Sequence, residues 1–205
     1  MKVAVINTKV GNLGAIPNML DRLGATARVT LDPTEIENAE RIVLPGVGSF
    51  DAAMRNLTRS GVLDVLRRRV IDDGIPLLGV CLGMELLADR SDEGALPGLG
   101  WVPGEALRFR FDHLDPAPRI PHMGWNIIRP TGDAPLLRDL GDRPRFYFAH
   151  SFYFSPTDPA DVIGVTQYGQ AFASVIQRKN IMGIQFHPEK SHRFGLAIFR
   201  NFLGQ

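Results

Sequence analysis

An unbroken apolar run from Ile75 to Val80 is the strongest constraint on the fold of this chain. A strand that is apolar at every position needs cover on both faces, which a parallel sheet flanked by helices provides. Shorter runs of similar character occur at Val3 to Ile6, Ala27 to Leu31 and Arg41 to Leu44. Because these runs alternate with segments of helical periodicity, the first half of the chain predicts an α/β fold.

The segments between these runs have the spacing of amphipathic helices. Apolar residues from Leu13 to Leu23 recur at helical intervals and stop at Gly24, which predicts a first helix. A second helix is expected after the turn from Pro45 to Gly48, with Ser49 as its N-cap, and helical spacing returns from Leu63 to Ile71.

The second half of the chain has a different pattern, in which short strand-like segments follow one another without helices. Lys179-Asn180 predicts a two-residue hairpin, and Phe194 to Phe202 predicts a closing helix. No loop is long and polar enough to separate domains, so we expect one domain over residues 1–205. Its sheet should be open, mixed and largely parallel, with antiparallel strands in the C-terminal half. The expected strands of this half are Ala106 to Phe111, Met123 to Ile128, Arg145 to Phe154, Asp161 to Thr166, Ser174 to Arg178 and Ile181 to Phe186.

Charge and cysteine content exclude several classes of function. Twenty-three basic and 22 acidic residues give a formal charge of +1, which favours neither nucleic acid nor an anionic membrane as a partner. The single cysteine, Cys81, excludes an intrachain disulfide and a cysteine-rich metal site, and it fits a reducing compartment. No run reaches the ~18 apolar residues of a membrane span, and the apolar stretch at the N-terminus is too short for a secretory signal. We therefore expect a cytoplasmic protein.

The sharpest local motif is Gly79-Val80-Cys81-Leu82-Gly83, which lies between the buried strand and the helix-like Met84 to Ala88. Small residues two positions either side of the cysteine allow the tight strand-to-helix turn that presents a nucleophile above a sheet edge. The backbone N–H groups after Cys81 and the helix N-terminus favour an anion, and we expect them to lower the pKa of the thiol. A buried structural cysteine beside two packing glycines is the alternative at this point.

A thiol nucleophile needs a base, and His187 has the best position among the five histidines. It follows a strand that ends at Phe186, so it lies at the carboxyl edge of the sheet, as Cys81 does. Pro188 fixes the backbone after it, and Glu189 is close enough in sequence to orient the imidazole. Cys81, His187 and Glu189 thus form a candidate triad. An ordinary strand-end histidine with a surface glutamate remains the open alternative.

Three other segments have weaker functional interpretations. A metal site of His187, Glu189 and His192 is disfavoured because a proline interrupts any helix and the spacing places the histidines on different faces. The two glycines of Pro45 to Gly48 permit an N–H group to complete an oxyanion hole, although a simple turn explains them equally well. His150-Ser151 interrupts an aromatic segment and is a secondary candidate for a strand end that faces a site.

These motifs occur together, and in the same order, in the class I (triad) glutamine amidotransferases, which the chain resembles over nearly its full length. The cysteine elbow and His-Pro-Glu are common to that class. Pro-His-Met-Gly-Trp-Asn is the signature of one branch, the glutaminase subunits of imidazole glycerol phosphate synthases in histidine biosynthesis. The matching segments are Pro45 to Gly48, Gly79 to Met84, Pro121 to Asn126, Phe146 to Ser151 and Gln185 to Ser191.

The resemblance implies that the Cys81 thiol attacks the carboxamide of glutamine. His187 would shuttle the proton to the leaving ammonia while Glu189 holds His187, and water would then release glutamate from a glutamyl thioester. Backbone N–H groups would stabilise the oxyanion, and a carboxylate would accept the ammonium group of the substrate. The implied residues are Val47, Gly48 and Leu82 for the oxyanion, and Glu85, Glu93, Ser151 and Phe152 for substrate binding.

The resemblance also implies a heterodimer. A (β/α)8-barrel synthase subunit would receive the ammonia, close the ring of imidazole glycerol phosphate and release an aminoimidazole carboxamide ribonucleotide. Neither a cofactor nor a metal is implied. The residues that match the partner-facing surface combine an apolar, aromatic centre with polar margins, and they are Asn12, Pro121, Met123, Trp125 and Lys190.

Two positions depart from the family pattern. Glu85 stands where members usually have Gln, so an extra carboxyl replaces an amide; we expect it to be protonated through burial or turned away from the pocket. The segment Asn7 to Val10 lacks the glycine that is more usual near Lys9. Two alternatives follow: an amidotransferase subunit that serves another acceptor pathway, or a structural or regulatory subunit that Glu85 has impaired.

Overall fold

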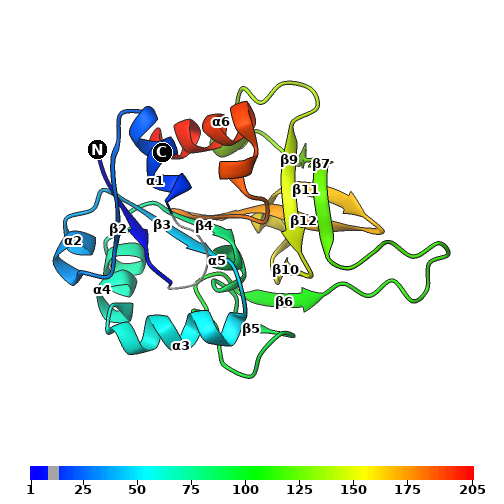
Figure 1. Ribbon diagram of the computed structural model, residues 1–205, viewed down its shortest axis with the longest axis horizontal. Helices are drawn as coiled ribbons and strands as arrows, with labels where there is room; N and C mark the ends of the chain where they lie inside the picture. The colour runs from blue at the N-terminus through cyan, green and yellow to red at the C-terminus, as the bar shows by residue number, and fades with distance from the viewer. Residues whose placement is uncertain (9–13) are drawn as a thin grey trace.

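The structure, a computed structural model, describes residues 1–8 and 14–205. Within these residues the main sheet has eight strands in the order β2-β1-β3-β4-β13-β12-β11-β8 (Figure 1). Strands β2, β1, β3, β4 and β13 run parallel, and β12, β11 and β8 extend the sheet in antiparallel pairs. The predicted mixed, largely parallel sheet is therefore confirmed. The strands are β1 (Lys2–Ile6), β2 (Thr26–Thr30), β3 (Arg41–Gly46), β4 (Leu77–Cys81), β8 (Arg129–Pro130), β11 (Val162–Tyr168), β12 (Gln170–Arg178) and β13 (Ile181–Ile184).

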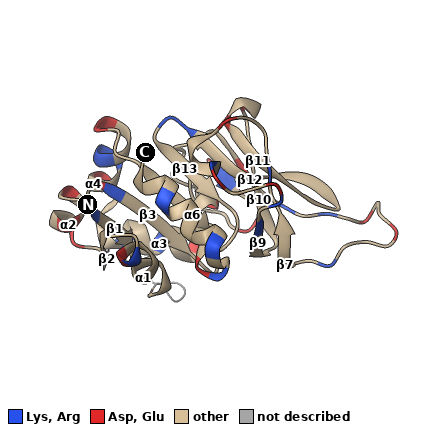
Figure 2. Ribbon diagram, turned by 90° about the horizontal axis from the view of Figure 1, so that it is seen from above, with Lys and Arg blue, Asp and Glu red and all other residues tan. Residues whose placement is uncertain are grey.

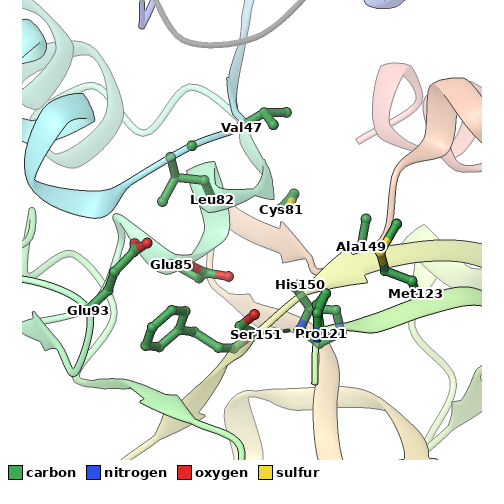
Figure 3. A pocket seen from close by; sticks show the side chains of 12 residues that line it. Val47, Cys81, Leu82, Glu85, Glu93, Pro121, Met123, Ala149, His150 and Ser151 are labelled. Atoms are coloured by element: carbon green, nitrogen blue, oxygen red, sulfur yellow. Dashed lines mark hydrogen bonds between the residues drawn. The ribbon is translucent and has the colours of Figure 1, made fainter. Parts of the chain in front are cut away.

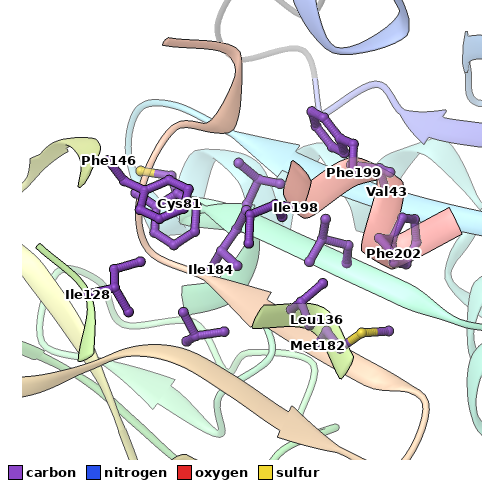
Figure 4. Packing of buried hydrophobic residues seen from close by; sticks show 14 of the residues in the cluster. Val43, Cys81, Ile128, Leu136, Phe146, Met182, Ile184, Ile198, Phe199 and Phe202 are labelled. Atoms are coloured by element: carbon purple, nitrogen blue, oxygen red, sulfur yellow. The ribbon is translucent and has the colours of Figure 1, made fainter. Parts of the chain in front are cut away.

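Helices cover both faces of this sheet, with α1 and α6 on one face and α3 and α4 on the other (Figure 1). The alternation of side chains along the buried strands explains the two layers. In β1, Val3 and Val5 pack in the layer that α1 and α6 cover, whereas Ala4 and Ile6 pack in the opposite layer. Figure 4 shows the first layer, where Phe199 and Phe202 lie at one end and Cys81 at the other. The helices are α1 (Ala15–Arg22), α3 (Phe50–Ser60), α4 (Leu63–Arg67) and α6 (His192–Leu203).

Short helical elements differ from the sequence prediction. The helix α2 (Pro33–Glu37) was not predicted, because five residues are too few to show a period; Asp32 caps it by accepting the N–H of Thr34 at 2.7 Å. The segment from Leu63 continues beyond α4 as a π-helical turn, η1 (Arg68–Asp72). The helix after the cysteine, α5 (Leu82–Glu85), starts and ends earlier than predicted.

The second half of the chain adds two smaller sheets. The predicted hairpin at Lys179-Asn180 joins β12 to β13. The prediction of one strand from Arg145 to Phe154 is wrong, because the chain turns at Ser151: β9 pairs with β7, whereas β10 pairs with β6. Buried aromatic residues alternate across the break, so the apolar pattern did not indicate the change of partner. The strands are β5 (Arg90–Ser91), β6 (Gly104–Arg108), β7 (His122–Ile127), β9 (Arg145–His150) and β10 (Phe152–Pro156), with short 3-10 turns at η2 (Pro135–Leu137), η3 (Pro159–Asp161) and η4 (Pro188–Lys190).

The connection from β6 to β7 is the most extended part of the molecule. It projects away from the body in two perpendicular views (Figures 1 and 2). Acidic and basic residues are spread over the ribbon in Figure 2, in keeping with a formal charge of +1. Among residues 1–8 and 14–205, no helix has the length and apolar character needed to cross a membrane.

Candidate active site

The site lies where three parallel strands end at the same edge of the sheet. Gly46 at the end of β3 is paired with Cys81 at the end of β4, and Ile184 at the end of β13 is paired with Val80. His187 follows β13 by three residues, so the strand order brings the two candidate groups to one edge. This is the placement that the sequence predicted for both residues.

Cys81 occupies a tight turn between β4 and α5. Its backbone has φ 54° and ψ −115°, a conformation that residues with a Cβ rarely adopt. A Cβ on Gly83 would lie 1.7 Å from the carbonyl oxygen of Leu44, and a Cβ on Gly79 would lie 2.7 Å from that of Gly83. Both flanking positions therefore require glycine, which is the physical basis of the elbow motif.

His187 is held from several sides. Its backbone N–H donates to the carbonyl of Tyr147 at 2.9 Å, and Ser191 Oγ donates to its carbonyl at 2.6 Å. Its Nδ1 lies 2.8 Å from Glu189 Oε1, so the carboxylate fixes the tautomer that carries hydrogen on Nδ1 and leaves Nε2 as the basic nitrogen. In the described part of the chain no hydrogen bond joins Cys81 Sγ to His187. Contacts of this kind are commonly long without substrate and shorten when it binds.

A cavity of about 270 Å³ opens beside the elbow. In Figure 3 Glu93 and Glu85 lie toward one end, Met123 and Ala149 lie at the other, and Cys81 lies between them. The cavity has room for a ligand of amino-acid size and offers both carboxyl and apolar groups. Its lining residues are Val47, Gly48, Cys81, Leu82, Glu85, Glu93, Pro121, Met123, Ala149, His150, Ser151 and Phe152.

The cavity is lined by all seven residues that the sequence assigned to oxyanion and substrate contacts, together with two assigned to the partner surface. His187, Glu189, Trp125 and Lys190 are outside its lining. Ala149 was missed and His150 was only a secondary candidate, because their exposure to the cavity depends on the turn at Ser151. Asn12 and the Lys9-Val10 part of the departing loop lie outside the described residues.

The expectation of a lowered thiol pKa is wrong for this structure. Cys81 is buried, and burial raises its pKa well above the usual range; the nearby Glu85 adds to the rise at the high pH where its own side chain is ionised. The backbone N–H of Leu82 acts in the opposite direction but does not outweigh burial. The helix α5 has four residues, too few to give its N-terminus a strong field. The thiol is therefore protonated at rest and would need a base to act as a nucleophile.

Glu85 is the second buried ionisable group of the site. Burial raises its pKa to about 8, the charge of Glu93 adds to the rise, and a hydrogen bond from Gln185 lowers it. Gln185 Nε2 donates to Glu85 Oε1 at 2.8 Å. At neutral pH the side chain is a carboxylic acid, close in shape to an amide and without the charge that would repel a thiolate. Of the two expectations for Glu85, protonation by burial is the one that the geometry supports.

Because Glu85 is protonated at neutral pH, the KM for glutamine should depend on pH differently in the wild type and in the Glu85→Gln variant. Below pH 7 both side chains are neutral, so the KM for glutamine should be similar. With a pKa of about 8, most wild-type Glu85 is ionised at pH 9, and the wild-type KM should rise about tenfold relative to that of the variant. Steady-state kinetics from pH 6 to 9 measure this, and parallel KM profiles for the two proteins would contradict it.

Glu85 also affects stability with a defined sign. Its folded pKa of about 8 exceeds the ordinary value of 4.5, so the unfolded chain loses this proton first as the pH rises. The wild type should therefore lose stability relative to Glu85→Gln between about pH 4.5 and 8. The gap between the two melting temperatures should widen over that interval, and a constant gap would oppose the interpretation.

Glu93 differs from Glu85 because it is exposed and anchored by the backbone. Its Oε2 accepts the N–H of Phe50 at 2.7 Å, at the N-terminus of α3. A helix N-terminus stabilises a negative charge, so Glu93 is a fixed acceptor at the end of the cavity. This arrangement suits an ammonium group in the ligand.

Next to the cavity lies an exposed apolar surface. Met123 and Trp125 on β7 are 63% and 40% exposed. Trp125 stacks on His192 with ring centroids 5.5 Å apart, and Lys190 Nζ lies 5.3 Å from the centre of the Tyr147 ring. Apolar side chains so exposed, with a cation at the margin, are typical of protein interfaces. Among the residues that the structure describes, no cluster of three or more His, Cys, Asp or Glu is placed to hold a metal.

A thiol in a strand-to-helix elbow, with a carboxylate-bound imidazole after the neighbouring strand, is the arrangement of α/β enzymes that use a cysteine nucleophile. The chain belongs to the glutamine amidotransferase class-I family, whose model matches residues 4–205. It is 46% identical to imidazole glycerol phosphate synthase subunit HisH 2 of Pseudomonas aeruginosa, over 98% of each chain. Its identity to the HisH subunit of Leptospira borgpetersenii is 44%, again over 98% of each.

Solved structures show the same fold at lower identity. A crystal structure of a glutamine amidotransferase superposes with a TM-score of 0.76 at 21% identity, covering 98% of this chain and 97% of the other. A glutamine amidotransferase of Thermotoga maritima gives a TM-score of 0.67 at 17% identity, covering 95% of this chain and 78% of the other. The predicted class of fold is thus confirmed.

Proposed function

We propose that the chain is the glutaminase subunit of an imidazole glycerol phosphate synthase, in histidine biosynthesis. It hydrolyses glutamine to glutamate and ammonia and delivers the ammonia to a synthase subunit. Relatives at 42–46% identity over nearly the whole chain are HisH subunits of that synthase. The observation that carries the proposal is the pairing of His187 with Glu189 beside the Cys81 elbow.

The proposed reaction uses Cys81, His187 and Glu189. Cys81 Sγ attacks the carboxamide carbon while His187 Nε2 takes the thiol proton, which is needed because burial keeps the thiol protonated. The C–N bond breaks as the imidazolium returns that proton to the leaving ammonia. Water, activated by His187, then cleaves the thioester and releases glutamate and the thiol. Glu189 stabilises the imidazolium through its 2.8 Å contact with Nδ1.

The remaining cavity residues fit the groups of glutamine. Backbone N–H groups of Val47, Gly48 and Leu82 are the proposed oxyanion donors, because all three residues line the cavity beside Cys81. Glu93 would accept the ammonium group, and the backbone of Ser151 and Phe152 would hold the amino-acid end. The neutral Glu85 would take the place of the amide found in other members. These residue roles are supported by position and chemistry.

The proposed partner is a (β/α)8-barrel synthase subunit, bound over Pro121, Met123, Trp125 and Lys190. Pro121 and Met123 both line the cavity and reach the surface, so a partner seated there adjoins the site of ammonia release (Figure 3). Ammonia that escapes into water becomes protonated and loses its nucleophilicity, so direct transfer preserves it. The single domain over residues 1–205 and the cytoplasmic location stay predictions.

Trp125→Ala should weaken the partner complex more than it affects folding. Trp125 is 40% exposed and its ring contacts are with the exposed His192 and the half-buried Tyr147, so its loss leaves the buried core intact. Buried interface tryptophans commonly contribute about 2 kcal/mol or more, a roughly thirtyfold change in affinity. Titration of the barrel subunit and a melting curve measure the two effects. A large fall in melting temperature with unchanged coupling would show that Trp125 serves packing instead.

The function itself is tested by measuring glutamate release from glutamine by the chain alone, and then with the barrel synthase and its nucleotide substrate. We expect weak turnover alone and strong stimulation in the complex, with none for Cys81→Ser under either condition. Turnover that the barrel subunit does not stimulate would support another acceptor pathway. No turnover with any partner would support an impaired regulatory subunit, although the neutral Glu85 argues against impairment.

A further inference from the structure

Two buried histidines that the proposed triad does not use lie opposite each other on neighbouring strands. His122 on β7 and His150 on β9 are directly paired in the strand register and are 3% and 5% exposed. His122 Nδ1 lies 3.0 Å from His150 Nε2. A buried imidazole pair needs a defined arrangement of protons, because each ring nitrogen must donate or accept.

The neighbouring groups define that arrangement. The carbonyl of Phe152 lies 2.6 Å from His150 Nδ1 and can only accept, so Nδ1 carries the hydrogen and Nε2 accepts from His122 Nδ1. His122 Nε2 then accepts from Asn126 Nδ2 at 3.2 Å, and the same amide donates to the carbonyl of Gln167 at 3.0 Å. The hydrogen bonds run in one direction from Asn126 to Phe152, and no ring nitrogen of the pair is left without a partner.

Adding a proton to the pair would break this order, since two N–H groups would then face each other. Burial also disfavours the protonated rings: it lowers the pKa of His122 to about 4 and that of His150 to about 3. Both rings are therefore neutral at physiological pH. Their contribution is therefore one of position, which distinguishes them from His187.

Aromatic side chains pack closely around the pair and hold it in place. The ring of His122 lies between Tyr168 and Phe148, with ring centroids 4.0 and 4.7 Å away and interplanar angles of 23° and 22°. Tyr168 also donates through its hydroxyl to the carbonyl of Arg119 at 2.7 Å, close to the cavity residue Pro121. The ring of His122 cannot move without displacing these neighbours.

The His122–His150 pair lies between the cavity and the exposed apolar surface on β7. At one end, His150, Ser151 and Phe152 form one wall of the cavity, where Figure 3 shows His150 beside Pro121. At the other end is β7, whose alternation points Met123 and Trp125 outward, while His122 and Asn126 face inward toward the pair and β11. The strand that presents the exposed apolar surface is thereby tied to the carbonyl that shapes the cavity.

We propose that His122 and His150 are positioning residues: they hold the Ser151–Phe152 wall in the shape that binds the amino-acid end of glutamine, and they link that shape to the barrel subunit proposed to bind over β7. The proposal rests on the proposed glutaminase function for its ligand. It predicts that contacts on β7 change the affinity for glutamine, and with it the turnover at sub-saturating glutamine, through His122 and without any proton transfer by the pair.

The tautomers provide a test that does not require turnover. Long-range 1H–15N spectra of the 15N-histidine-labelled chain at pH 7 should show two neutral rings that carry hydrogen on Nδ1, which is the less common tautomer in water. Glutamine added to a Cys81→Ser background should shift the His150 signals. Protonated rings, hydrogen on Nε2, or His150 signals that do not shift at saturating glutamine would each overturn the proposal, whether or not the wild type is active.

Matched variants test the positioning role by kinetics. His150→Asn keeps a donor near the place of Nδ1 for Phe152, whereas His150→Phe keeps the ring volume but no donor. The KM for glutamine should rise about tenfold in His150→Phe with kcat within about threefold, and His150→Asn should restore most of the loss; tenfold corresponds to about 1.4 kcal/mol. Equal KM values in both variants, alongside lowered melting temperatures, would indicate a purely structural role.

A second pair isolates the link to β7 and leaves the contact between His150 and Phe152 in place. His122→Phe should reduce the stimulation of glutamine turnover by the barrel subunit about tenfold, and His122→Asn, which keeps the donor, should retain it. A wild-type chain that shows no glutamine turnover contradicts the proposed function. Full stimulation of His122→Phe in an otherwise active system contradicts the link alone.

Discussion

Replacing Cys81 by alanine is expected to lower glutamine hydrolysis by about 10⁴-fold or more, because Cys81 is the only thiol of the chain and the proposed nucleophile. The remaining donors of the cavity can still bind glutamine, so its affinity should change little. The side chain packs at the end of one apolar layer and makes no ion pair in the described structure, so the variant should fold. Glutamate release, glutamine binding and a melting curve separate the three effects.

A comparison of Cys81→Ala with Cys81→Gly tests the strain in the elbow. At most positions in a strand, glycine is about 1 kcal/mol less stable than alanine. At φ 54° and ψ −115° the order should reverse, because glycine adopts this conformation without a steric cost. We expect the glycine variant to melt at or above the temperature of the alanine variant, with both inactive. The ordinary order of stability would show that Cys81 is not strained.

Gly83→Ala is expected to destabilise the fold by roughly 3 kcal/mol, the upper part of the usual range for overpacking. The new Cβ would lie 1.7 Å from the Leu44 carbonyl oxygen, so β3 and the start of α5 must separate. Both elements belong to the site, and turnover should fall with stability. For a chain of this length the melting temperature should drop by about 6–12 °C.

Gly132→Ala is the matched control for this substitution. A Cβ there meets no atom within 4 Å, and its backbone is outside the positive-φ region. Its stability should stay within about 0.5 kcal/mol of wild type. If Gly83→Ala were as harmless as this control, the close approach of the elbow to β3 would not exist in solution.

Much of the fold was predictable because it depends on local pattern. The fully apolar strand Leu77–Cys81 and its parallel neighbours follow from burial on both faces, and two glycines beside Cys81 signalled the elbow. The distance of two residues between His187 and Glu189 was enough to predict their contact, since a proline between them restricts the backbone. In each case the pattern that gave the prediction lies within a short segment of the sequence.

The failures share a cause, which is dependence on residues far away in sequence. Phe146 to Phe154 has one aromatic alternation, yet β9 and β10 belong to different sheets because β7 and β6 approach from elsewhere. His122 and His150 are separated by 28 positions, so no spacing in the sequence indicated that their rings would be hydrogen-bonded to each other.

The sequence by itself determined the α/β class and the position of the thiol, and it predicted His187 as the candidate base, since strand burial, the glycine elbow and the His-Pro-Glu turn are properties of short segments. Only the tertiary structure decided the ionisation of the site. The pKa of Cys81 is raised because the surrounding layers exclude water, and Glu85 is neutral because it lies buried against Gln185 and near Glu93. Solvent exclusion depends on every element that packs around a group, and those elements are assembled from distant parts of the chain.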